Sequence, residues 1–124
     1  MGNCGDLFVF QLSYDLAKKI FFVSKLFPKD ELYGLTDQIR RSSRSICTNI
    51  GEAYRKRIYP KHFVNKVSDA DGECLETLIW LQMAKDYGYL DQKTFKELSQ
   101  EYERVGRILG SMIQNPEKFC HGKN

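Results

Sequence analysis

The residues with the most evident chemistry are seven cations gathered in one stretch of the chain, between Leu35 and Lys61. They are mostly arginines: Arg40, Arg41, Arg44, Arg55, Lys56, Arg57 and Lys61. Seven cations against the two acids of this stretch give a local charge of +5, and since the whole chain carries +3, the remainder carries −2. Arginine binds phosphate through paired hydrogen bonds. The cluster therefore predicts a nucleic-acid-binding surface whose affinity falls with salt, with Tyr54 and Tyr59 available to stack on bases.

Two other interpretations of the cations stay open. Arg41 can pair with Asp37 one helical turn away, and Arg55 can pair with Glu52; the arginines can also bridge subunits to acids such as Asp69. A run of charges on a bundle is otherwise an ordinary solvated face. The interpretations of the cations differ in whether the guanidinium groups already have carboxylate counterions within the protein.

A second polar constellation is predicted to be structural. Asn49 stands between the apolar residues Ile46 and Ile50, close to the predicted core. Because an unpaired buried amide costs about 1–3 kcal/mol, Asn49 is expected to hydrogen-bond to Glu73 or Glu76 and to fix helix register.

Catalytic and metal-binding patterns are not found in the sequence. No Glu is followed three residues later by His, the pairing that di-iron bundles use, and no glycine-rich phosphate loop occurs. The four cysteines lie too far apart for a zinc site: Cys4, Cys47, Cys74 and Cys120. Cys47 and Cys74 are expected to be small core residues. We expect a protein that is not an enzyme and that holds no metal or cofactor.

The elements that must position these residues are four helices in one domain spanning residues 1–124. The composition, 42% hydrophobic and 28% charged, is that of an ordinary globular domain. Apolar residues recur at steps of three and four over about 10–27, 35–57, 61–87 and 91–114, and the tail 115–124 is expected to be loose. Short connections favour antiparallel neighbours, so the fold class is all-α, an antiparallel up-down four-helix bundle.

Several local signals set the ends of these helices. Pro28 and Pro116 stop the first and the last helix, and Pro60 suits a first helical turn. Gly88 suits a left-handed helix end, and Asp91 suits an N-cap. Gly72, inside the third helix, is expected to allow close helix packing. That helix carries apolar residues on two sides, so we expect a homo-oligomer with the first or third helix at its interface.

The sequence also resembles a known bacterial family of four-helix bundles, named for reading frames within intervening sequences of 23S ribosomal RNA genes. The stretches that carry the resemblance are Phe27–Lys29, Tyr33–Ser42, Ser45–Ile46, Asn49–Ile50, Glu76–Thr77 and Ala84–Leu90. The chain is also similar to the accessory protein of diversity-generating retroelements. The resemblance implies a ring-like homopentamer, and that relative's behaviour implies binding of nucleic acid and of a reverse transcriptase.

Taken together, we expect a non-enzymatic homopentameric accessory protein that binds RNA or DNA through the basic surface of the second helix. The alternative is a scaffold whose ring docks a partner protein without any nucleic-acid role. No apolar run approaches the ~20 residues of a membrane span and no signal peptide is evident, so a cytoplasmic location and no membrane partner are expected.

Overall fold

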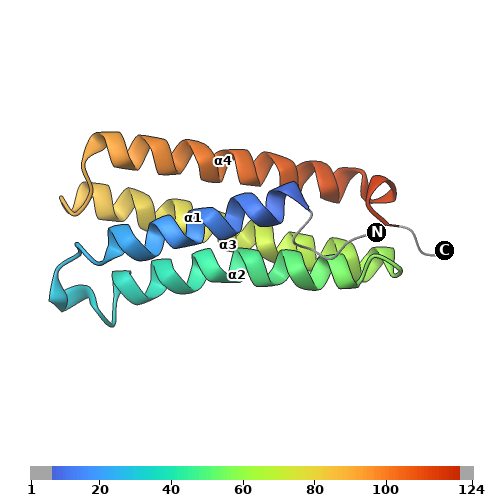
Figure 1. Ribbon diagram of the computed structural model, residues 1–124, viewed down its shortest axis with the longest axis horizontal. Coiled ribbons are helices and arrows are strands. Elements are labelled where there is room, and N and C mark those ends of the chain that lie inside the picture. Colours follow the sequence, from blue (N-terminus) through green and yellow to red (C-terminus); the bar gives the residue numbers. More distant parts are fainter. Residues whose placement is uncertain (1–6, 121–124) are drawn as a thin grey trace.

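The chain folds into four long antiparallel helices. The structure, a computed structural model, describes residues 7–120. The helices are α1 (Phe8–Ser24), α2 (Leu35–Arg55), α3 (Pro60–Asp86) and α4 (Gln92–Gln114), with short 3-10 turns η2 (Lys29–Glu31) and η3 (Pro116–Lys118). They run alternately up and down along one long axis (Figure 1). The residues described contain no strand, and none of their helices is long and apolar enough to cross a membrane.

Each helix buries one stripe of side chains, as the periodicity predicted. The α4 stripe is Leu98, Tyr102, Val105, Leu109 and Met112, at alternating steps of four and three. The same alternation runs along α3 from Phe63 to Ala84. This spacing keeps one seam turned toward the neighbouring helices, and removal of these side chains from water is the main driving force for the fold.

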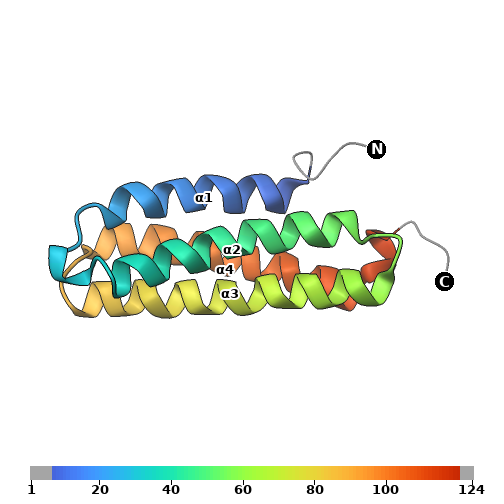
Figure 2. The same cartoon turned by 90° about the horizontal axis from the view of Figure 1, so that it is seen from below.

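The four helices form a square in which α1 and α3 lie on a diagonal. Helices α2 and α4 each pack against both of them, whereas the backbones of α1 and α3 do not come close to each other. Helix α1 has 17 residues against the 21 to 27 of the other three. The end of the bundle that holds the α2–α3 connection therefore extends beyond the start of α1 (Figure 2).

Small polar residues join the helices inside the core. The Thr77 hydroxyl of α3 donates to the Ser42 hydroxyl of α2 across 2.8 Å, with both side chains buried. The Cys74 thiol donates to the Tyr102 carbonyl of α4 at 3.1 Å, which confirms its place in the core. Burial raises the pKa of that thiol to about 12, so it stays protonated.

Three predicted helix ends are confirmed. Pro60 occupies the first turn of α3, and Gly88 follows the end of α3 with φ of +84°. The Asp91 carboxylate accepts a 2.7 Å hydrogen bond from the Thr94 backbone at the start of α4. That bond lowers the pKa of Asp91, because it favours the charged carboxylate.

Other local expectations need correction. Helix α1 ends at Ser24 rather than at residue 27, because Phe27 is buried in the following turn against Tyr89. Gly72 does not serve close packing: a Cβ there would meet nothing within 4 Å. The tail was expected to be loose, but its described part forms η3 and stacks Phe119 on Phe63, with ring centroids 6.2 Å apart. Residues 121–124 of that tail lie outside the described residues.

Candidate nucleic-acid interface

The outer face of α2 forms a ridge, here called the α2 ridge, made of Arg41, Arg44, Thr48, Glu52 and Arg55. These residues follow one another at steps of three and four, which places them on one side of a helix. All five are exposed. Within residues 7–120, neither Arg41 nor Arg44 has a carboxylate within ion-pair distance. Two guanidinium groups one turn apart therefore face solvent without a fixed counterion.

A second group of cations lies at the α2–α3 connection. Arg55 ends α2, and Lys56 and Lys61 flank the turn; all three are exposed and none forms an ion pair within the part of the chain described. From Arg44 to Arg55 the helix rises about 16 Å. The short α1 does not reach this end of the bundle (Figure 2), and the cations form two groups along α2.

Arg40 does not belong to this surface, which corrects the sequence prediction. Its Nε donates to the Ser24 hydroxyl at 2.7 Å, and its guanidinium lies 4.9 Å from the centre of the Phe21 ring. A further nitrogen reaches the Phe21 carbonyl at 3.5 Å. Arg40 therefore holds the C-terminal turn of α1 against α2, where a positive charge also suits the helix dipole.

Arg57 is likewise occupied within the protein. Its side chain is buried, its Nε donates to the Tyr54 carbonyl at 2.8 Å, and its guanidinium stacks 3.6 Å from the centre of the Tyr54 ring. Tyr54 is itself buried, so it is not the base-stacking residue that the sequence suggested. Tyr59, the other tyrosine of the cluster, is exposed at the α2–α3 connection beside His62.

The two ion pairs that would neutralise the ridge from within α2 do not form. Neither Asp37 with Arg41 nor Glu52 with Arg55 lies within 4.0 Å. The Glu52 carboxylate instead accepts a hydrogen bond from the Lys66 ammonium of α3, with 2.9 Å between Oε1 and Nζ. That hydrogen bond and the negative charge of Glu52 raise the pKa of Lys66. The single acid of the ridge is thus held by a lysine from the neighbouring helix.

The predicted structural cluster of Asn49, Glu73 and Glu76 does not assemble. Asn49 is half-buried and donates to the Ser45 carbonyl of its own helix at 2.9 Å. Glu73 is half-buried, and Glu76 is exposed. The interhelical bond expected from Asn49 is made by Ser42 and Thr77 instead. Partial burial and repulsion from Glu76 raise the pKa of Glu73, while the charge of Arg41 partly opposes the shift.

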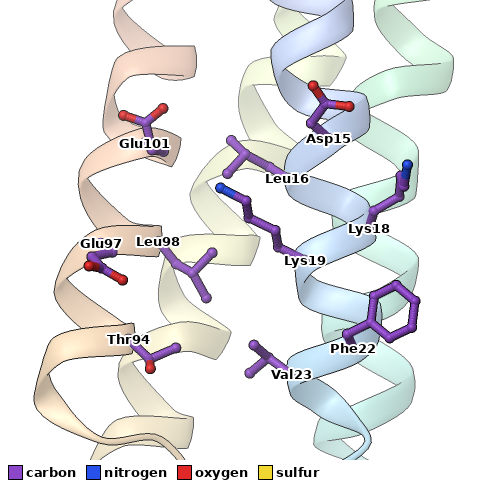
Figure 3. A pocket seen from close by; sticks show the side chains of 10 residues that line it. All are labelled: Asp15, Leu16, Lys18, Lys19, Phe22, Val23, Thr94, Glu97, Leu98 and Glu101. Carbon is purple, nitrogen blue, oxygen red and sulfur yellow. The ribbon is translucent and has the colours of Figure 1, made fainter.

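A wide groove separates α1 from α4, with a volume of about 830 Å³. Figure 3 shows Leu16 and Lys19 of α1 on the side toward α4, which presents Glu97 and Glu101. Acids on one wall and a lysine on the other make this groove mixed in charge and poorly suited to phosphate. Lys18 leaves α1 on the side away from α4 (Figure 3).

Lys18 is the residue that sequence reasoning missed. It lines a second hollow, between α1 and α2, together with Arg44. The two are 26 residues apart in the chain, so no local pattern joins them. Only the pairing of α1 with α2 brings a cation of the first helix next to the α2 ridge.

Residues 7–120 do not assemble a site for metal binding or for thiol chemistry. No group of three His, Cys, Asp or Glu side chains is placed to hold a metal ion there. Cys47 and Cys74 are free and buried, and Cys120 is partly buried. Burial raises the pKa of all three thiols above its usual value, which lowers the fraction of reactive thiolate.

The fold and surface define an all-α, four-helix-bundle protein that exposes cations along its second helix. The sequence model of the 23S rRNA-intervening sequence protein family matches residues 5–111. The chain belongs to this family, as its sequence motifs indicated. A crystal structure of a protein with unknown function from the S23 ribosomal protein family of Bacteroides thetaiotaomicron is similar, with a TM-score of 0.78 and 26% identity; the match covers 86% of this chain and 95% of that one. No curated protein matches the sequence significantly.

Proposed function

We propose that this protein is a non-enzymatic accessory protein that binds RNA or DNA through the phosphate backbone. The contacts come from the exposed cations of α2 and of the α2–α3 connection: Arg41, Arg44, Arg55, Lys56 and Lys61. The observation that carries the proposal is that these five exposed groups have no ion pair within the part of the chain described. Like charges on one surface repel, and an anionic polymer relieves that repulsion while releasing counterions.

We also propose that the protein acts as a homopentamer; the number five follows from the resemblance to the retroelement accessory protein. Support for self-association comes from α3, whose outer face exposes Leu75, Ile79 and Met83, with exposed Tyr87 directly after the helix end. Steps of four residues place them in one row. An apolar row of this kind is typical of a covered surface, and a ring would repeat the cations once in every subunit.

The test is a salt-dependent binding titration with fluorescent RNA and DNA oligonucleotides. The double variant R41A/R44A is expected to lose affinity at low salt. The slope of log Kd against log salt is expected to become shallower by the amount that corresponds to about two lost phosphate contacts per subunit. The control is R104A/R107A on α4, which removes two exposed arginines at the same spacing and changes net charge equally. Equal losses in both variants, or no binding by the wild-type protein at low salt, would contradict the proposal.

A gain of binding offers a second test of the same surface. Glu52→Gln removes the acid of the α2 ridge and frees Lys66 from its ion pair. Phosphate affinity is expected to rise by several-fold at low salt and to return toward the wild-type value at high salt, because screening weakens the added charge. Glu103→Gln on α4 changes net charge by the same amount and is expected to leave affinity nearly unchanged.

The second candidate is a scaffold that docks a partner protein. It is favoured by a different surface, the connection between α1 and α2, where Leu26 is 81% exposed, Tyr33 92% and Leu32 49%. This connection lies at the opposite end of the bundle from the α2–α3 turn (Figure 1). If this candidate is correct, Leu26→Asp abolishes capture of a protein partner while R41A/R44A leaves it intact.

A further inference from the structure

A hollow on the surface lies between α1 and α2, directly beside the α2 ridge. It has a volume of about 510 Å³, within the roughly 300–1,000 Å³ typical of small-ligand sites. Its walls are Tyr14, Ala17 and Phe21 of α1 and Cys47 of α2, and its polar edge includes Lys18 and Arg44. The hollow is therefore apolar inside and carries two cations at its edge.

The two aromatic rings of the hollow differ in availability. Phe21 already has the Arg40 guanidinium 4.9 Å and the Lys25 ammonium 4.7 Å from its ring centre. Tyr14 is 49% exposed, and its one ring neighbour among the described residues is Phe10, tilted at 6.0 Å between centroids. Tyr14 is thus the ring on which a further flat group can stack, while Ala17 and Phe21 supply the apolar floor.

The edge of the hollow carries two cations, which favour an anionic ligand. Arg44 belongs to the α2 ridge and lines the hollow as well, and Lys18 of α1 lines it beside Arg44. Asp15 of α1 lines the α1/α4 groove, and its charge also reaches Cys47 in the wall of the hollow, so the two cations at the edge outnumber this acid. A flat apolar group linked to a phosphate could therefore stack on the apolar wall while its phosphate contacts the cations at the edge.

We propose that this hollow is a base-binding site for single-stranded nucleic acid. One unpaired base stacks on Tyr14, and the phosphates on either side of its nucleotide contact Arg44 and Lys18. A duplex cannot use the site, because its bases are paired and stacked inside the helix, whereas an unpaired base can swing outward onto an aromatic ring. The inference rests on the proposed function and narrows it from nucleic acid in general to single strands.

The experiment compares a short single strand with the blunt duplex of the same sequence, each as RNA and as DNA, and places one 2-aminopurine in the single strand. Tyr14→Ala is expected to weaken single-strand binding about tenfold or more and to abolish the quenching of 2-aminopurine that stacking causes. Tyr14→Phe keeps the ring and is expected to bind as the wild type does. Tyr33→Ala removes another exposed tyrosine, 92% accessible and outside the hollow, and is expected to change neither reading.

The outcomes separate this inference from the proposed function. If single strand and duplex bind equally and Tyr14→Ala matches Tyr33→Ala, the base site is wrong, while a loss in R41A/R44A still supports phosphate binding. If the wild-type protein binds neither polymer, the proposed function itself is wrong. Far-UV circular dichroism of Tyr14→Ala checks its fold, which is expected to match the wild type because Tyr14 is half-exposed.

Discussion

Arg40 and Arg41 are neighbours in the sequence and have different environments. One residue step turns a helix by about 100°. That step takes Arg40 into contact with Ser24 and Phe21 of α1 and leaves Arg41 exposed on the α2 ridge. The sequence assigned both arginines to one surface. In the structure, Arg40 stabilises the packing of α1 on α2, whereas Arg41 faces solvent.

The first prediction tests this division. Arg40→Ala is expected to lower the free energy of unfolding by about 1.5–3 kcal/mol, because Ser24 and the end of α1 lose a charged hydrogen-bond donor. Arg41→Ala is expected to change it by less than about 0.5 kcal/mol, as exposed substitutions usually do. Urea unfolding followed by circular dichroism measures both, and similar losses in the two variants would show that the assignment is mistaken.

Glu73 gives a prediction about pH. Its pKa is raised by partial burial and by Glu76, so the folded state disfavours the charged carboxylate. The protein is therefore expected to lose some stability as pH rises through the folded pKa of Glu73, and the loss is absent below the ordinary carboxyl pKa of 4.5.

The variant that checks it is Glu73→Gln. It is expected to be more stable than the wild type at neutral pH and equally stable at a pH below the ordinary carboxyl pKa, because protonated Glu and Gln are both neutral. Glu103→Gln on α4, an exposed position, serves as the control and should show no such pH-dependent gain. A gain that persists unchanged at acid pH would exclude the carboxylate as its cause.

At the scale of elements, the helices could be predicted from sequence because two independent signals agreed. Steps of three and four marked the buried faces, and Pro60, Gly88 and Asp91 marked ends by local backbone chemistry. The end of α1 was misplaced because Phe27 continues the apolar spacing but packs from a turn. Spacing alone does not distinguish a helical residue from a buried loop residue.

The candidate site was less predictable, because its parts depend on which helices become neighbours. The cations of α2 could be listed from the chain, but the burial of Arg57 against Tyr54 depends on how the turn after α2 closes. Lys18 joins Arg44 only through the packing of α1 on α2. Sequence periodicity describes the faces of one helix and gives no information about which faces meet.

Gly72 provides a prediction for α3. A Cβ at this exposed mid-helix position meets nothing within 4 Å, so Gly72→Ala should reduce only the backbone entropy lost on folding. The free energy of unfolding of the isolated chain is expected to rise by about 0.5–1 kcal/mol. Chemical denaturation at low protein concentration measures this gain, and a loss of stability would mean that the glycine performs a structural role within the subunit.

At the scale of the whole molecule, the exposed surfaces fall on different elements. The α2 ridge and the α2–α3 connection carry cations, and the α1–α2 connection carries Leu26 and Tyr33. The outer face of α3 carries the apolar row of Leu75, Ile79 and Met83, which Tyr87 continues just after the helix end. Self-association through α3 would leave the cations of α2 free to act together. Separate surfaces can be altered separately, which allows assembly and binding to be tested one at a time.

The last prediction therefore concerns Ile79, at the centre of the apolar row. Ile79→Asp places a charge where a second copy would pack, and the desolvation of that charge is expected to convert the assembly to monomers in multi-angle light scattering. Its affinity for a long single strand is expected to fall at least tenfold through lost multivalency, whereas affinity for an oligonucleotide that spans one subunit should persist.

Leu26→Asp, a charge at an 81% exposed apolar position on another surface, is the control and should keep the wild-type mass. A wild-type mass for Ile79→Asp would exclude this face of α3 as the subunit contact, and dissociation by Leu26→Asp would assign that contact to the α1–α2 connection.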